Sequence, residues 1–207
     1  MIDVNFFIKY DSKQVRNNVA HLSDEEIVKR LKAGDDDAFD ELIERHKKMG
    51  FSLAYNMLGS VEDAEDISQE AFAIVYTEIG KFRQESSFKT WLYRIIINLC
   101  RRHYRKNKLM SFIPLYSHNK EGEDQELDIK AAGVTPEDEI SNKELSSAII
   151  KAVRRLPMKQ RGVFVMKHIK GMKISEIAEI LGSAEGTIKS HLFRAVNELQ
   201  KKLRGFI

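Results

Sequence analysis

Residues 173–196 read KISEIAEILGSAEGTIKSHLFRAV, and their spacing decides what kind of fold the chain has. Apolar residues recur at the spacing of one helical face, at Ile174, Ile177, Ala178 and Leu181. Ser175 is suited to cap the start of this short helix, and Gly182 suits a left-handed residue that ends it. The stretch therefore predicts a short amphipathic helix followed directly by a tight turn.

A second helix follows that turn. Its apolar face consists of Ile188, Leu192, Ala195, Val196, Leu199 and Leu203. The opposite side carries Ser190, Phe193, Arg194 and Asn197, with Thr187 and Lys189 at the leading end. Two short helices joined by a tight turn form a helix-turn-helix, whose second helix enters a DNA major groove. Phe193 would then pack on a thymine methyl, while Arg194 or Lys189 reaches guanine or phosphate. Thr187 and Ser190 would hold phosphates near the helix amino end. The alternative is an ordinary helical hairpin with a solvated outer face.

The bulk composition excludes several classes of protein. The chain has 207 residues with a formal net charge of +3, too small an excess to indicate a partner by itself. Its single cysteine, Cys100, excludes an internal disulfide and a multi-cysteine metal site, and fits a reducing compartment. No apolar run approaches the roughly 20 residues that a membrane helix needs. We therefore expect a cytoplasmic protein with no membrane insertion of its own and no cofactor.

The chain divides into two blocks. Three prolines and long stretches with a period near 3.6 predict an all-α protein of two small helical domains, residues 21–108 and 144–207. Residues 1–20 form an N-terminal extension, and 109–143 form a linker. Within the linker, residues 117–141 hold eight acids against two lysines, a net charge of −6. Such a composition is typical of a flexible acidic linker, either a solvated spacer or a segment that threads a basic channel in a partner.

A cationic helix ends the first block. Residues 88–108 contain seven lysines and arginines and no acid. Leu92, Ile95, Ile96 and Leu99 make its apolar face, and the opposite face carries Arg94, Asn98, Arg101, Arg102 and Arg105. An asparagine inside an arginine stripe fits base reading, because its amide donates and accepts while arginines hold phosphates. A merely solvated basic face is the alternative.

Two further stretches point toward nucleic acid. The loop FRQESSF, residues 82–88, offers Phe82, Ser86 and Phe88 as a site that could stack an unpaired base, although its aromatics could equally belong to the core. Residues 151–173 contain eight lysines and arginines and no acid, a composition that suits a phosphate backbone. Trp91 and Cys100 are interpreted as core residues.

An acidic helix precedes the cationic one. Residues 61–70 contain five acids and no lysine or arginine, so this helix cannot face nucleic acid. It is either a solvated face or a surface that docks on a basic protein.

Taken together, these stretches resemble the extracytoplasmic-function (ECF) sigma factors, the compact two-domain class of bacterial RNA polymerase specificity subunits. In the first block the resemblance rests on DAFDELIERH (37–46), AEDISQEAF (64–72) and FKTWLYRIIIN (88–98). In the second it rests on residues 156–182, LPMKQRGVFVMKHIKGMKISEIAEILG, and on GTIKSHLFRA (186–195). Ala184 and His191 depart from the family pattern, which makes the cap of the second helix uncertain and a phosphate contact at His191 weaker and pH-sensitive.

The resemblance implies a role for each surface. Residues 21–108 would read and open the minus-ten promoter element, and 144–207 would bind the minus-thirty-five element. Asp63, Asp66, Gln69 and Glu70 would dock on the clamp helices of core RNA polymerase. Asn98 and the arginines would meet minus-ten DNA, the 82–88 loop would hold a flipped base, and Thr187, Lys189, Ser190, Phe193 and Arg194 would meet the minus-thirty-five groove. The protein would be no enzyme, and family habit implies an anti-sigma factor as a further partner.

Two other readings compete with this one. A LuxR-type helix-turn-helix regulator shares a TIKSHL-like string, but its usual sensory or receiver domain has no counterpart in residues 1–108. A helical carboxylate-metal enzyme would need Glu-x-x-His on one helical face, whereas Glu44 and His46 are two residues apart and face different ways.

Overall fold

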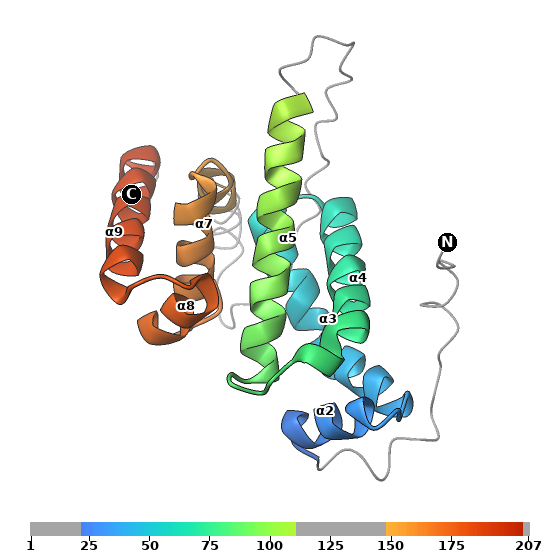
Figure 1. Ribbon diagram of the computed structural model, residues 1–207. Coiled ribbons are helices and arrows are strands. Elements are labelled where there is room, and N and C mark those ends of the chain that lie inside the picture. The colour runs from blue at the N-terminus through green and yellow to red at the C-terminus, as the bar shows by residue number, and fades with distance from the viewer. Residues whose placement is uncertain (1–21, 111–147, 205–207) are drawn as a thin grey trace, which may run out of the picture.

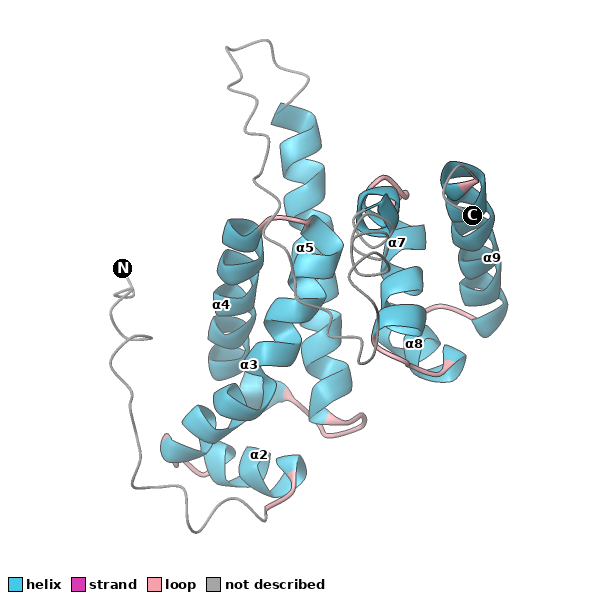
Figure 2. Cartoon of the chain, turned by 180° about the vertical axis from the view of Figure 1, so that it is seen from behind, coloured by secondary structure: helices cyan, strands magenta, loops and turns pink. Residues whose placement is uncertain are grey.

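The computed structural model describes residues 22–110 and 148–204, and within these two ranges every regular element is a helix. The expected all-α class is therefore confirmed. Figures 1 and 2 show the helices of the first range standing beside those of the second. The predicted N-terminal extension and the acidic linker lie outside the described residues, apart from the few linker residues that end the last helix of the first range.

The first range folds around three long helices. Its elements are α2 (Asp24–Lys32), α3 (Asp37–Leu58), α4 (Val61–Glu78), the short 3-10 turn η2 (Ile79–Lys81) and α5 (Phe88–Met110). Two serines start helices as capping rules require. Ser23 and Glu26 form a capping box at α2, and the Ser60 hydroxyl accepts a hydrogen bond from the Asp63 amide at α4. Both local signals are visible in the sequence, so the boundaries of α2 and α4 follow from it directly.

The second range holds the helix-turn-helix. Residues 148–154 are helical, followed by α7 (Met158–Phe164), the π-helical turn η3 (Val165–Ile169), α8 (Ile174–Leu181) and α9 (Glu185–Leu203). Gly182 ends α8 with φ of 57°, which confirms the predicted left-handed stop. The predicted Ser175 cap is wrong, because α8 begins at Ile174, so that Lys173 takes the cap position and Ser175 lies within the first turn. Its first turn is closed by the Glu176 carboxylate, which accepts a 2.6 Å hydrogen bond from the Lys173 amide.

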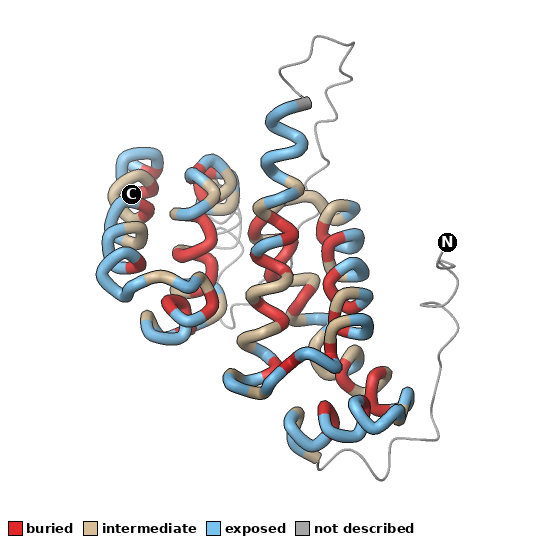
Figure 3. The backbone as a smooth tube through the Cα atoms, in the orientation of Figure 1, coloured by how far each residue is buried: buried red, intermediate tan, exposed pale blue. Residues whose placement is uncertain are grey.

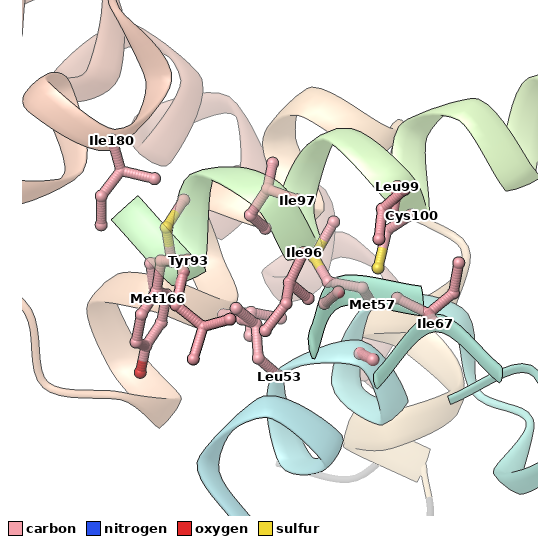
Figure 4. Close-up of a cluster of buried hydrophobic side chains, with 14 of the residues drawn as sticks. Leu53, Met57, Ile67, Tyr93, Ile96, Ile97, Leu99, Cys100, Met166 and Ile180 are labelled. Carbon is pink, nitrogen blue, oxygen red and sulfur yellow. The ribbon is translucent and has the colours of Figure 1, made fainter. Parts of the chain in front are cut away.

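The two ranges share one hydrophobic core, which spacing along the chain does not predict. Buried residues line the inward sides of α3, α4 and α5 and continue into α7 and α8 (Figure 3). Figure 4 draws Met166 of η3 and Ile180 of α8 in the same cluster as Tyr93 and Ile97 of α5, and all four are at most 2% exposed. Burial raises the pKa of the Cys100 thiol in this core to about 12, as expected of a buried cysteine.

The carboxyl end of α3 is completed by arginines from the second range. Arg161 is only 5% exposed and donates a 2.6 Å hydrogen bond to the Met57 carbonyl in the last turn of α3. Arg154 donates to the Tyr55 hydroxyl at 3.1 Å and stacks its guanidinium over the Tyr55 ring. Helix α3 has no basic residue of its own in its last turn. Because the carboxyl end of a helix carries partial negative charge, cations from the second range stabilise it.

Gly59 allows this contact. It adopts φ of 84° after α3, and a β-carbon there would lie 2.5 Å from Nε of Arg154. By comparison, Gly182 adopts φ of 57° with nothing within 4 Å of its would-be β-carbon.

We expect Gly59→Ala to destabilise the protein more than Gly182→Ala. Each substitution carries the strain of a left-handed non-glycine residue, about 1–2 kcal/mol. Only Gly59→Ala also displaces Arg154 from Tyr55. Chemical denaturation of both variants, each also in an Arg154→Ala background, measures the difference. Equal losses of unfolding free energy in the two variants would contradict this account of the contact. So would a larger loss for Gly59→Ala that persists in the Arg154→Ala background.

Candidate nucleic-acid and protein interfaces

The outer face of α9 is open. Thr187, Lys189, Ser190, Phe193 and Arg194 are all exposed on it, and the Phe193 side chain is 67% exposed. Lys189 pairs with Glu185 at 3.7 Å, and the Ser190 hydroxyl donates to the Gly186 carbonyl at 2.9 Å. The structure therefore brings all five predicted residues to one accessible surface at the amino-terminal half of the helix.

The cationic stripe of α5, defined as Arg94, Asn98, Arg101, Arg102 and Arg105, is only partly open. Asn98, Arg102 and Arg105 are exposed, whereas Arg94 and Arg101 are half-buried. Arg94 donates to two carbonyls at the end of α8, to Glu179 at 2.9 Å and to Ile180 at 3.3 Å. Arg94, the stripe residue nearest the amino end of α5, is thus engaged by the second range.

The aromatic residues of the 82–88 loop are core residues. Phe82 is 7% and Phe88 1% exposed, so neither ring has a free face for a base. The prediction that they stack an unpaired base is wrong for this arrangement, and the alternative that they belong to the core is the one observed. Phe82 instead stacks on Trp91 with ring centroids 4.6 Å apart, and Phe88 packs edge-on against the same indole. Ser86 in the loop between them remains half-buried.

Half-buried Trp91 is a candidate functional residue that the spacing of apolar residues did not reveal. With Phe82, Ile74 and Ile95 it lines a shallow hollow of about 200 Å³ between α4 and α5. The sequence interpretation placed its ring in the core. A tryptophan three residues after Phe88 has the spacing of a core residue. The sequence therefore does not show that the indole is only half-buried, and the fold does.

The acidic face of α4, defined as Asp63, Asp66, Gln69 and Glu70, lies against α5. Asp63 pairs with His103 at 3.2 Å, and Glu70 forms an ion pair with Arg102. Asp66 and Gln69 are exposed and form no hydrogen bond or ion pair to the described part of the chain. Gln69 borders an apolar groove of about 350 Å³ between α3 and α4, whose floor includes Ile43, Phe51 and Phe72. Spacing within α4 could not reveal this groove, because its other wall comes from α3.

The basic run of residues 151–173 is divided between a contact with α3 and the surface, where Lys151, Arg155, Lys159 and Lys173 are exposed. Arg154 and Arg161 face α3, and the Lys170 ammonium donates to the Ser52 hydroxyl. Burial lowers the pKa of both Arg161 and Lys170 from their ordinary values. Three of the eight cations therefore contact α3, Arg154 and Arg161 in its last turn and Lys170 at Ser52, earlier in the helix.

His191 lies on α9 among cations from three helices. Burial lowers the pKa of its imidazole from the ordinary value of 6.5, and the nearby charges of Arg194, Lys159 and Arg101 lower it further. The folded chain therefore binds a proton at His191 less readily than the unfolded chain does. Stability from this site is fully present above pH 6.5 and is lost as the pH falls below that value.

We expect His191→Gln to reduce the loss of thermal stability between pH 7.5 and pH 5.5. The variant removes the group that charges unfavourably in the folded state, while the other histidines titrate alike in both proteins. Melting temperatures of the two proteins across this range measure the effect. If the melting temperatures of both proteins fall in parallel, or that of the variant falls more steeply, His191 is not held in its neutral form.

Comparison with known proteins bears on these surfaces. The family model for Sigma-70 region 2 matches residues 42–109, and that for Sigma-70, region 4 matches residues 146–199. The ECF RNA polymerase sigma factor SigW of Bacillus subtilis (strain 168) is 40% identical over 177 residues, 86% of this chain and 95% of that protein. This chain belongs to the ECF RNA polymerase sigma factors. SigM of Mycobacterium tuberculosis (strain ATCC 25618 / H37Rv) is 34% identical over 181 residues, 87% of this chain and 85% of its own.

Solved structures agree on the fold. CnrH in complex with the cytosolic domain of CnrY has a TM-score of 0.62 at 21% identity, covering 88% of this sigma factor and 97% of that chain. RpoE of Bartonella quintana, in complex with the anti-sigma factor NepR, has a TM-score of 0.57 at 22% identity, covering 80% and 96%.

The LuxR-type reading is not favoured. The relatives align over both blocks of the sigma factor, including the first block, for which a LuxR-type regulator has no equivalent. In residues 22–110 and 148–204 no three His, Cys, Asp or Glu side chains gather as metal ligands. None of the helices in those ranges combines the length and apolar character needed to cross a bilayer.

Proposed function

We propose that this sigma factor directs core RNA polymerase to its promoters through three surfaces. The acidic face of α4 binds the polymerase clamp helices, the cationic stripe of α5 binds the minus-ten element, and the outer face of α9 binds the minus-thirty-five element. The observation that carries the proposal is the distribution of charge: acids gather on α4, whereas exposed cations gather on α5 and on α9. The acidic face excludes nucleic acid, and the two cationic faces lie on the two parts of the chain that match sigma regions 2 and 4.

The α9 assignment is supported by side-chain chemistry. Arg194 and Lys189 suit guanine or phosphate, and an exposed Phe193 suits a thymine methyl. Thr187 and Ser190 lie at the amino end of the helix, where partial positive charge favours phosphate oxygens.

Strand opening at the minus-ten element needs no ATP in this scheme. Unstacking a base costs a few kcal/mol, which contacts in a protein site offset. Asn98, Arg102 and Arg105 are exposed and suited to bind the opened strand. Ser86 keeps its proposed place in the flipped-base loop, with Phe82 and Phe88 as the buried floor that fixes the loop. The nucleotidyl transfer itself belongs to the polymerase, so no residue here is assigned a catalytic role.

An anti-sigma factor is a further proposed partner. The two structures with the same fold are both complexes, one with a cytosolic domain of a second protein and one with an anti-sigma factor. We propose that the sigma factor acts in the cytoplasm, where it alternates between such a partner and core polymerase.

Arg194→Ala is expected to weaken promoter binding by about 1–3 kcal/mol and to relax base choice at one minus-thirty-five position, because a base-reading contact is lost. The promoter is first recovered by transcribing a fragmented genomic library with core polymerase and the wild-type protein. Filter binding of the reconstituted holoenzyme then measures affinity. Lys201→Ala, an exposed cation in the last turn of the same helix, is the control. If Arg194→Ala binds like Lys201→Ala, the α9 assignment is wrong.

Asp66→Arg is expected to weaken association with core polymerase about tenfold or more, because like charges placed across an interface cost several kcal/mol. Asp66 is exposed, so the helical circular dichroism spectrum should not change. Competition for core polymerase against the wild-type protein measures the affinity. Glu25→Arg, the same change at an exposed acid of α2, should retain full affinity. Equal affinities for both variants would leave α4 as a merely solvated face.

A further inference from the structure

An apolar groove runs between α3 and α4, which lie side by side (Figure 1). Phe72 of α4 is buried at its floor, and Ile43 and Phe51 of α3 are half-buried along the facing wall. Its volume of about 350 Å³ falls within the range of sites that bind ligands, about 300–1,000 Å³. An apolar surface with a polar rim is typical of an interaction site, so the groove is suited to hold large apolar side chains.

The charges on the rim of the groove narrow the choice of occupant. The rim carries Lys47 and Lys48 on α3 and Glu65 on α4, and all three are exposed. Lys47 pairs with Glu44 at 2.5 Å, but an exposed ion pair of this kind contributes little and is readily exchanged. The best-matched occupant therefore has an apolar centre and carries two acids and one base.

The N-terminal extension contains a segment of this composition. Residues 3–11 read DVNFFIKYD. Their large apolar and aromatic side chains are Phe6, Phe7, Ile8 and Tyr10. Asp3 and Asp11 stand at the two ends of the segment, and Lys9 is its single base. The segment thus mirrors the charges of the groove, two acids and one base against two bases and one acid.

The extension joins the fold close enough to reach the groove. The described chain begins at Leu22, whose carbonyl accepts a 2.7 Å hydrogen bond from Nη1 of Arg45 on α3. Arg45 is two residues from Ile43, about 200° round the same helix. A helix with its side chains is about 10–12 Å across, whereas residues 12–21 span up to about 33 Å when extended. A short tether also gives an effective concentration in the millimolar range, which favours even a weak contact.

We propose that residues 3–11 dock in the groove between α3 and α4, with their aromatic side chains on its apolar floor, and that they compete there with core polymerase. The competition follows from position, because Gln69 lines the groove and also belongs to the acidic face of α4. Asp66 lies one turn earlier on the same helix. The competition rests on the proposed role of the acidic face, whereas the docking itself does not.

Cross-linking within the full chain tests the docking. Ile8→Cys is combined with Ser68→Cys, because Ser68 lines the groove and has no assigned role. The control pair combines Ile8→Cys with Thr77→Cys, at an exposed position near the end of α4. Cys100 is buried and does not compete for the reagent. A short bismaleimide is added, and gel mobility and mass spectrometry measure the yield of cross-linked monomer.

Substitution of the two phenylalanines removes the apolar anchor. Phe6→Ser combined with Phe7→Ser is the test variant, and Val15→Ser in the same extension is its matched control. Competition against the wild-type protein measures the affinity of each for core polymerase, with and without Asp66→Arg. If the docked state holds about nine-tenths of the molecules, its loss raises the apparent affinity about tenfold.

The expected result is cross-linking at Ser68 well above that at Thr77, reduced to the Thr77 level by the two phenylalanine substitutions. Polymerase should bind the phenylalanine variant about tenfold more tightly and Val15→Ser unchanged. Equal yields at Ser68 and Thr77 would overturn the docking. Cross-linked dimers in place of monomers would also overturn it, because a second copy would then fill the groove.

The polymerase measurements separate the competition from the proposed function. Cross-linking at Ser68 without a gain in affinity, while Asp66→Arg still weakens binding, would overturn the competition and leave the proposed function intact. If Asp66→Arg has no effect in either background, the acidic face does not bind polymerase. The assignment of α4 then fails together with the competition, and the cross-linking alone decides the docking.

Discussion

The hydrogen bonds of Arg161 are the constraint on which the joined structure depends. A buried guanidinium is costly unless its donors are paired, and the two terminal nitrogens of Arg161 donate to backbone carbonyls of Met57, Leu156 and Arg154, although its Nε has no partner. One of these carbonyls belongs to the last turn of α3, and the other two precede α7. The same side chain therefore fixes the end of a helix in one range, the start of a helix in the other, and the distance between them.

Ion pairs link two of the three proposed surfaces, the acidic face of α4 and the cationic stripe of α5. Two members of the acidic face of α4 pair with α5, Glu70 with the stripe residue Arg102 and Asp63 with His103. A partner that draws away the acids of α4 releases cations on α5. Binding of polymerase by the acidic face would thus make the stripe more available to DNA, a coupling that needs no movement of the backbone.

Much of the architecture follows from local sequence signals. Apolar spacing predicts the helices, Gly182 predicts the end of α8, and the alternation of faces in α9 places its five candidate residues on an open surface. These features succeed because each depends on one helix and its neighbouring turn. The burial of Phe82 and Phe88, and the contacts of Arg154, Arg161 and Lys170 with α3, could not be predicted for the opposite reason. Whether a ring or a cation faces solvent depends on helices distant in sequence. The acceptors of Arg161 and Arg94 are backbone carbonyls, which every residue carries, so the residue types do not reveal them.

Transcription by bacterial core RNA polymerase is the most direct test of the account that this chain selects promoters by its two cationic faces. Core enzyme is incubated with a fragmented genomic library with and without the purified sigma factor, and the 5′ ends of the transcripts are sequenced. The account predicts new start points that share one sequence element about ten and another about thirty-five base pairs upstream, the spacing at which the two DNA surfaces act. Start points identical to those of core enzyme alone, or new ones without shared upstream elements, would contradict it.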